Sequence, residues 1–162
     1  MERYTKKIKK AAGIGLWGSV AMVILAAAFT LASPYRFYAS RHTMQWMLVA
    51  GSILAVLAVS MSLLVIRRQI PALRQTEGLE AKLEGYSRHI ASLYYSMLAI
   101  VTMVCAMAVL SAQNTLLMLA MVATLMLFLA YPNMYRMKVE LGLSDDEMRS
   151  LYGDKYIGGN EE

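Results

Sequence analysis

The chain has 162 residues, of which 58% are apolar and only 17% are charged. Soluble domains carry about 25% charged residues, so this composition excludes an ordinary soluble domain. The net charge of +5 would suit nucleic acid, but the charges gather in three clusters, as the cytoplasmic loops of a membrane protein require. The charge therefore indicates membrane topology rather than a nucleic-acid partner. The single cysteine, Cys105, excludes a disulfide within one chain.

Two stretches of 25 uncharged residues come first, one between Lys10 and Arg36 and one between Arg41 and Arg67. A helix of that length extends about 37 Å, whereas the hydrocarbon core of a bilayer is about 30 Å thick. The first two membrane spans are therefore expected at about 12–33 and 44–66.

The basic segment MERYTKKIKK in front of the first stretch also fits a secretory signal. However, the apolar stretch exceeds the 7 to 15 residues that are typical of a signal, and Pro34 is poorly placed for cleavage. We therefore expect an uncleaved first span.

The next uncharged stretch runs for 47 residues, from His89 to Tyr135, which is more than one helix can use. A polar break at 111–115 divides it, so two further spans are expected at about 90–111 and 115–131. A connection this short makes the two helices antiparallel neighbours. Because every backbone polar group must be paired in lipid, all the spans are expected to be helices.

These patterns predict an all-α membrane protein with four transmembrane helices in an antiparallel bundle. Residues 1–162 would form this single domain, with 133–162 as a tail. Of the 16 Lys and Arg residues, 14 lie in the first ten residues, the 67–91 loop and the tail, and only Arg36 and Arg41 lie between the first two spans. This distribution predicts that both termini are cytoplasmic. The short outer loops favour the inner membrane of a bacterium.

Aromatic residues near the ends of the spans are expected to anchor the helices at the membrane interfaces. On the outer side these residues are Tyr35, Phe37, Tyr38 and Trp46; on the inner side they are Trp17, Tyr86, Tyr94, Tyr95, Tyr131 and Tyr135.

Helices in lipid associate through close backbone approach, so small residues are expected to mark their contacts. The spacing of small residues in the second span places them on one helical face, and the first span has small residues near its cytoplasmic end. The candidate helix-packing residues are Gly15, Gly18, Gly51, Ala55, Ala58 and Ser62. These two faces are expected to pack on each other or on a second subunit.

The cytoplasmic segments carry helix signals. After a break at Pro71, an apolar face from Leu79 to Leu93 predicts an amphipathic helix that runs into the third span, with Glu84 and Arg88 as an i, i+4 pair. After Pro132, a short helical face is expected to end at Gly142, and a final short helix to begin with a capping box and end at Gly153. The capping box would pair Ser144 with Glu147.

The spans contain no Asp, Glu, Lys or Arg, which excludes a proton- or ion-coupled transporter because such proteins need ionisable groups at membrane depth. Their hydroxyl side chains can each bond to their own helix. No catalytic motif is present, so no enzyme activity, cofactor or metal site is expected. Methionine pairs such as Met44 with Met47 and Met118 with Met121 could bind Cu(I), but flexible packing explains them without a metal.

The favoured interpretation is a non-enzymatic interaction, assembly or scaffold subunit. Its expected partners are membrane lipids and either a second copy of the chain or another membrane protein. The alternative is an uncoupled channel or a carrier for an uncharged or lipid-like solute, with an enzyme acting on lipid in third place. A carrier should contain a cavity that opens to one side or to lipid, whereas an assembly protein should have a closed core.

Overall fold

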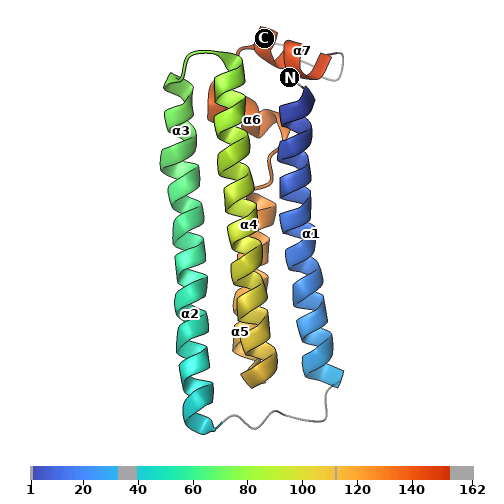
Figure 1. The fold of residues 1–162 in the computed structure, drawn as a ribbon, viewed down its shortest axis with the longest axis vertical. Coiled ribbons are helices and arrows are strands. Elements are labelled where there is room, and N and C mark those ends of the chain that lie inside the picture. The colour runs from blue at the N-terminus through green and yellow to red at the C-terminus, as the bar shows by residue number, and fades with distance from the viewer. Residues whose placement is uncertain (1, 33–39, 112, 154–162) are drawn as a thin grey trace, which may run out of the picture.

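The computed structural model describes residues 2–32, 40–111 and 113–153, and every regular element in these ranges is helical. The longer helices are α1 (Glu2–Ala32), α2 (Arg41–Leu64), α4 (Leu79–Ser111) and α5 (Asn114–Leu129). The shorter ones are η1 (Val65–Gln69), α3 (Ile70–Ala72), η2 (Leu73–Gln75), α6 (Met134–Leu141) and α7 (Asp145–Tyr152). Figure 1 shows the long helices side by side, with α7 at the end where α1 begins.

Within the described ranges, three helical segments are long and apolar enough to cross a membrane: α1, α2 with its continuation to Gln75, and α4. Helix α5 has 16 residues and is about 24 Å long, which is shorter than the hydrocarbon core. It qualifies as a fourth span only together with α6, to which it is joined at a bend of 77°.

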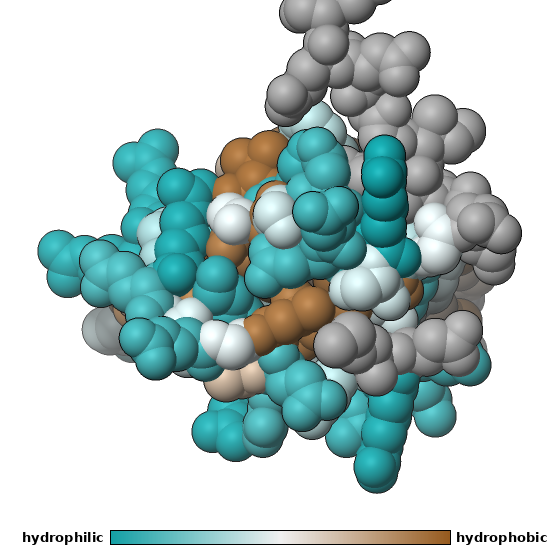
Figure 2. All heavy atoms as spheres, turned by 90° about the horizontal axis from the view of Figure 1, so that it is seen from above, coloured by the Kyte–Doolittle hydropathy of each residue, from teal (hydrophilic) through white to brown (hydrophobic). Residues whose placement is uncertain are grey.

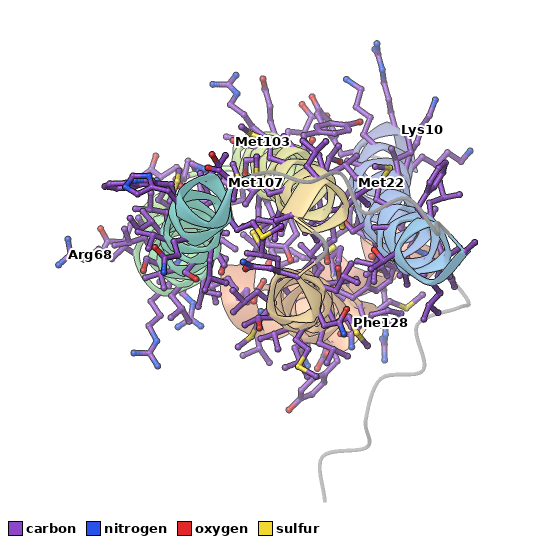
Figure 3. The ribbon with its side chains drawn as sticks, turned by 90° about the horizontal axis from the view of Figure 1, so that it is seen from below. Lys10, Met22, Arg68, Met103, Met107 and Phe128 are labelled. Carbon is purple, nitrogen blue, oxygen red and sulfur yellow. The ribbon has the colours of Figure 1, made fainter. Side chains whose placement is uncertain are left out.

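Helix α4 lies at the centre of the fold and packs against α1, α2 and α5. Views from the side and along the helices place α1 and α2 on opposite sides of the α4 and α5 pair (Figures 1 and 3). As the short connection predicts, α4 and α5 are neighbours that run in opposite directions. The most extensive packing is between α1 and α4, which run in the same direction.

Small residues of α1 allow this close approach to α4. A β-carbon added at Gly15 would lie 2.7 Å from Cβ of Tyr94 and 2.9 Å from its carbonyl oxygen. A β-carbon at Gly18 would lie 3.0 Å from Cδ1 of Leu98. The backbones of α1 and α4 are therefore closer at Gly15 than any residue with a β-carbon permits.

The small residues of α2 are buried as well. Ala55, Ala58 and Ser62 are each less than a tenth exposed, and a β-carbon at Gly51 would lie 2.5 Å from Cδ2 of Leu116 in α5. The small-residue faces of α1 and α2 thus meet α4 and α5. Within the single chain they do not pack on each other, because α4 and α5 lie between them (Figure 3). Their packing on a second subunit stays a prediction.

Pro71 does not end the second helical segment, contrary to the sequence-based prediction. Proline has no N–H, and its ring collides with the carbonyl group four residues earlier. Here η1 widens the helix into a π-turn, in which the N–H of Ile70 donates to the carbonyl oxygen of Val65, five residues back. This bulge accommodates Pro71, and the helical path continues through α3 and η2 to Gln75.

The caps of the two last helices agree with the sequence. The Asn133 side chain accepts a hydrogen bond from the N–H of Arg136 at the start of α6, and Gly142 ends that helix at φ 61°. Ser144 and Glu147 form the predicted capping box of α7, which ends at Gly153.

The long helices expose large apolar side chains. These include Trp17 and Phe29 on α1, Val56 on α2, and Leu125 and Leu129 on α5, each more than half exposed to the surroundings of the chain. In water such a surface would drive aggregation. Surrounded by hydrocarbon, it costs nothing.

The hydroxyl groups of the long helices bond largely to their own backbones. Such bonds, of 2.7 to 3.0 Å, run from serine and threonine hydroxyls to carbonyl groups three or four positions earlier. The residues concerned are Ser19, Thr30, Ser62, Ser96, Thr102 and Thr124. These hydroxyl groups therefore have no free proton to donate to a polar solute that would pass between the helices.

Candidate functional site

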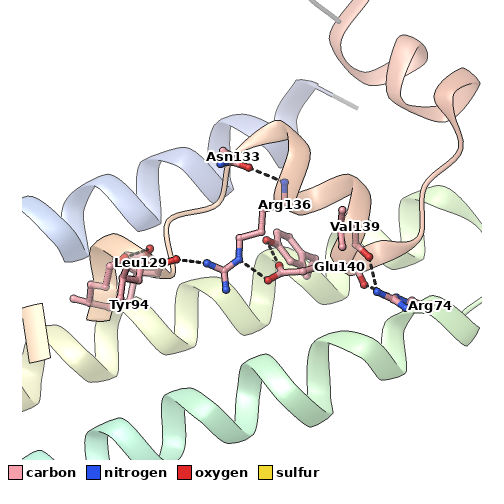
Figure 4. Close-up of polar contacts among 9 residues, drawn as sticks. Arg74, Tyr94, Leu129, Asn133, Arg136, Val139 and Glu140 are labelled. Carbon is pink, nitrogen blue, oxygen red and sulfur yellow. Dashed lines mark hydrogen bonds and ion pairs between the residues drawn. The ribbon is translucent and has the colours of Figure 1, made fainter. Parts of the chain in front are cut away.

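The charged side chains with defined partners gather at the end of the helices where α1 begins and α6 and α7 lie; we call this the polar end. Figure 2 looks down on it, and hydrophilic side chains cover most of the visible surface. Glu140 in α6 is the centre of a network that connects α4, α5 and α6 (Figure 4). The polar end is therefore where a candidate site is to be sought.

The carboxylate of Glu140 has two partners. Its Oε2 accepts a hydrogen bond of 2.8 Å from the hydroxyl of Tyr86 in α4. Its Oε1 accepts one of 2.5 Å from Nε of Arg136, one turn earlier in α6. The Glu140 side chain is only 14% exposed, so these bonds are made largely out of water, where charge-assisted hydrogen bonds are strong.

Arg136 also caps the end of α5. Its Nη1 donates to the carbonyl oxygen of Leu129, the last residue of α5. The carbonyl group at this position has no hydrogen-bond partner within the helix. Tyr94 of α4 donates to the carbonyl oxygen of Leu127 over 2.9 Å. Together the two side chains satisfy carbonyl groups that the break before Pro132 would otherwise leave unpaired (Figure 4).

Arg74, in the connection between α2 and α4, holds the other end of α6. Its Nε donates to the carbonyl oxygen of Glu140 over 3.0 Å, and its Nη2 to that of Val139 over 2.5 Å. These are carbonyl groups of the last turn of α6, where a positive charge is also favoured by the helix dipole. Arg74 thus fixes α6 against the connection between α2 and α4.

Helix α7 is held by contacts with α6 and α1. Lys138 forms an ion pair of 2.7 Å with Asp145, and the ammonium group of Lys9 lies 5.7 Å from the centre of the Tyr152 ring. Met148 and Leu151 are buried beneath the helix. Burial raises the pKa of the Tyr152 hydroxyl above its usual range. Because α7 buries its apolar face on the protein, its polar face points outward.

The structure corrects two of the predicted interfacial anchors. Tyr86 and Tyr94 are completely buried and use their hydroxyl groups inside the protein, whereas an anchor would face the headgroups. They follow the buried face of α4, together with Leu83, Ile90 and Met97. Trp17, Trp46 and Tyr135 are more than 60% exposed, in keeping with the predicted role. Tyr35, Phe37 and Tyr38 lie outside the described residues.

The candidate packing residues and the network residues are different sets. Gly15 and Gly18 contact α4, and Gly51 contacts α5, in the helical body rather than at the polar end. The sequence analysis assigned no role to Glu140, and it included Arg74 and Arg136 only among the charges that set the topology. A signal for Glu140 was present, since Arg136 and Glu140 have i, i+4 spacing on the helix predicted after Pro132.

The polar network is suited to holding elements in place. Every charged group named above is paired with a carbonyl group, a carboxylate, an ammonium group, a guanidinium group or a ring. In the described part of the chain, no group of three or more His, Cys, Asp or Glu residues is placed to hold a metal ion. The Glu84 and Arg88 pair predicted from the sequence is present at 3.4 Å, with both side chains well exposed.

An apolar groove of about 440 Å³ lies between α1 and α4. Met22 and Phe29 of α1 line one side, and Cys105 and Leu110 of α4 line the other. A smaller groove of about 220 Å³ lies between α2 and α5, next to Ala55 and Ala123. Grooves with apolar linings at membrane depth suit acyl chains rather than polar solutes.

Comparison of this protein with models of known protein families, with curated proteins and with solved structures finds no match. The class of protein follows from its helices. In its described residues it is an all-helical protein with three helices long and apolar enough to cross a membrane, or four spans if α5 and α6 count as one broken span.

Proposed function

We propose that this protein is a multi-pass membrane protein with four spans, in which α5 and α6 together form the fourth, broken span. Although α5 alone is short, apolar side chains at its end, such as Leu129, are exposed and can be covered by lipid. Its last carbonyl groups accept hydrogen bonds from side chains, so they can lie in hydrocarbon without being left unpaired. Four crossings in the directions seen in Figure 1 place the first residues of α1 and helix α7 on the same side of the membrane.

That side is the cytoplasm in our proposal, and the membrane is the inner membrane of a bacterium. The polar end contains Lys and Arg residues of the first ten residues, of the connection between α2 and α4, and of α6 and α7. The excess of positive charge on cytoplasmic segments supports this orientation.

The proposed role is a non-enzymatic interaction or assembly subunit, in which the long helices anchor the chain and α6 and α7 present a fixed surface to a partner protein. The observation that carries this role is the use of Glu140, Arg136, Arg74 and Tyr86 to fix α6 across the polar end. These side chains hold a short helix in place, and the polar face of α7 points outward. This arrangement supports recognition of another protein more than catalysis of a reaction.

The apolar groove between α1 and α4 supports a second candidate, a carrier for a lipid-like solute. Its volume of about 440 Å³ is within the range of small-molecule sites. An uncoupled channel for polar solutes is less well supported, because the hydroxyl protons of Thr102 and Thr124 are committed to their own helices.

A photo-crosslinking amino acid at Arg149, on the exposed side of α7, tests the proposed role. We expect a discrete adduct with one protein in cells of the source organism. The matched control places the same probe at Leu125, an exposed position of α5, and is expected to give lipid adducts. If Arg149 gives no protein adduct and the purified chain moves a lipid-like solute between liposomes faster than empty vesicles do, the carrier is the correct function.

A further inference from the structure

A polar pocket of about 300 Å³ lies between α1 and α4, near the start of each helix, and none of its lining residues belongs to the network around Glu140. It is the most polar of the hollows described above, since the grooves between the long helices are lined by apolar side chains. The pocket is lined by Arg3, Tyr4, Lys7, Glu84, Ser87 and Arg88.

The charges of this pocket favour an anion. Three of its lining residues are cationic and one is anionic, and Glu84 already pairs with Arg88. Arg3 and Lys7 repel each other at i, i+4 spacing on α1, and neither has an ion-pair partner among the side chains that the structure describes. An anion between α1 and α4 would relieve this repulsion and gain charge-assisted hydrogen bonds from both residues.

The donors fit a phosphate group. The guanidinium group of Arg3 offers a pair of N–H donors that match phosphate oxygens, and Lys7 adds a mobile ammonium group. Arg88 keeps the N–H donors that its pair with Glu84 does not use. The hydroxyls of Tyr4 and Ser87 can donate to the remaining oxygens. A phosphate diester carries one negative charge and a phosphate monoester up to two, so either can be neutralised by this set.

The depth of the pocket fits a lipid headgroup. Lys7 precedes the uncharged stretch of α1 by four residues and Ser87 precedes Ile90 by three, which places them about 6 Å and about 4.5 Å beyond the apolar part of the helices. The headgroup layer of a bilayer is about 5 to 7 Å thick on each side. The pocket therefore opens at the level where lipid phosphates lie.

Several other basic residues at the polar end are already engaged or lie apart. Arg74 and Arg136 are engaged with carbonyl groups and with Glu140, and Lys138 with Asp145. Arg68 extends away from the packed helices (Figure 3). We propose that the pocket between α1 and α4 binds the phosphate of an anionic phospholipid of the cytoplasmic leaflet; this inference rests on the membrane insertion and orientation proposed above.

Lipid binding in mixed micelles tests the proposal with the full chain. The wild type and two variants are extracted from membranes with detergent, incubated with equimolar phosphatidylglycerol and phosphatidylcholine of the same acyl chains, and analysed by native mass spectrometry. We expect the wild type to retain phosphatidylglycerol preferentially, and Arg3→Gln with Lys7→Gln to reduce this preference about tenfold. The matched variant Arg67→Gln with Arg68→Gln removes the same charge outside the pocket and should keep it.

Equal loss of preference in both variants, or no preference in the wild type, would overturn the proposal, because general surface charge would then explain lipid binding. Inorganic phosphate is added in a separate arm. Displacement of phosphatidylglycerol by millimolar phosphate would assign the pocket to a soluble phosphate compound instead. A chain that leaves the membrane in a salt wash would contradict membrane insertion itself, so that failure is distinguished before the lipid assay begins.

Discussion

Replacing Gly15 with alanine should destabilise the packing of α1 on α4 by about 1 to 3 kcal/mol, which is the usual cost of forcing extra atoms into a packed interior. The added β-carbon would meet Cβ and the carbonyl oxygen of Tyr94. Neither the carbonyl oxygen nor the Cβ atom, which is fixed to the backbone, can turn aside as the end of a side chain can, so the two helices must move apart. The buried thiol of Cys105 reports this movement, because its rate of alkylation rises as α4 becomes accessible during unfolding in mixed micelles.

Gly13→Ala is the matched control in the same helix. A β-carbon at Gly13 has no atom within 4 Å, so this substitution should be neutral or should stabilise the helix by up to about 1 kcal/mol through helix propensity. If both variants protect Cys105 equally well, close contact at Gly15 does not hold α1 on α4.

Replacing Glu140 with alanine should cost about 2 to 3 kcal/mol, because it leaves the buried Tyr86 hydroxyl without its acceptor and removes the carboxylate that faces Arg136. Limited proteolysis at the polar end should then cleave between α6 and α7 faster than in the wild type. The double variant Tyr86→Phe with Glu140→Ala should lose less stability than the sum of the losses in the two single variants, because both changes remove the same hydrogen bond.

The chain offers a matched comparison for this pair. Glu84 and Arg88 have the same spacing, but their side chains are 58% and 77% exposed, and exposed i, i+4 pairs contribute only about 0.3 to 0.5 kcal/mol. Glu84→Ala should therefore leave stability almost unchanged. Equal effects of Glu84→Ala and Glu140→Ala would show that the network does not hold α6 in place.

The long helices and caps could be predicted because each depends on local sequence. Runs without charge indicated the helices that are apolar enough to cross a membrane. The spacing of Leu83, Ile90 and their apolar neighbours by three or four residues indicated the buried face of α4. The capping box at Ser144 and the end at Gly142 were likewise visible. These features need only the residues within one helix.

Features that depend on neighbouring helices could not be predicted in this way. Pro71 indicated a break, but whether a helix ends or widens into a π-turn depends on how the neighbouring residues are packed, and here Ile70 is fully buried. Tyr94 looked like an anchor because its acceptor, the carbonyl of Leu127, belongs to another helix. The small residues of α1 and α2 indicated close contacts without showing that α4 and α5 would be the partners.

Thiol accessibility from outside the cell tests most directly the claim that four spans cross a membrane with the polar end inside. On a Cys105→Ala background, single cysteines replace Ser40, before α2, and Thr76, between η2 and α4. In spheroplasts, a membrane-impermeant maleimide should label Ser40→Cys, should label Thr76→Cys only after lysis, and both proteins should stay in the membrane pellet without detergent. Labelling of Thr76→Cys but not of Ser40→Cys from outside, or recovery of the chain in a high-speed supernatant, would contradict the account.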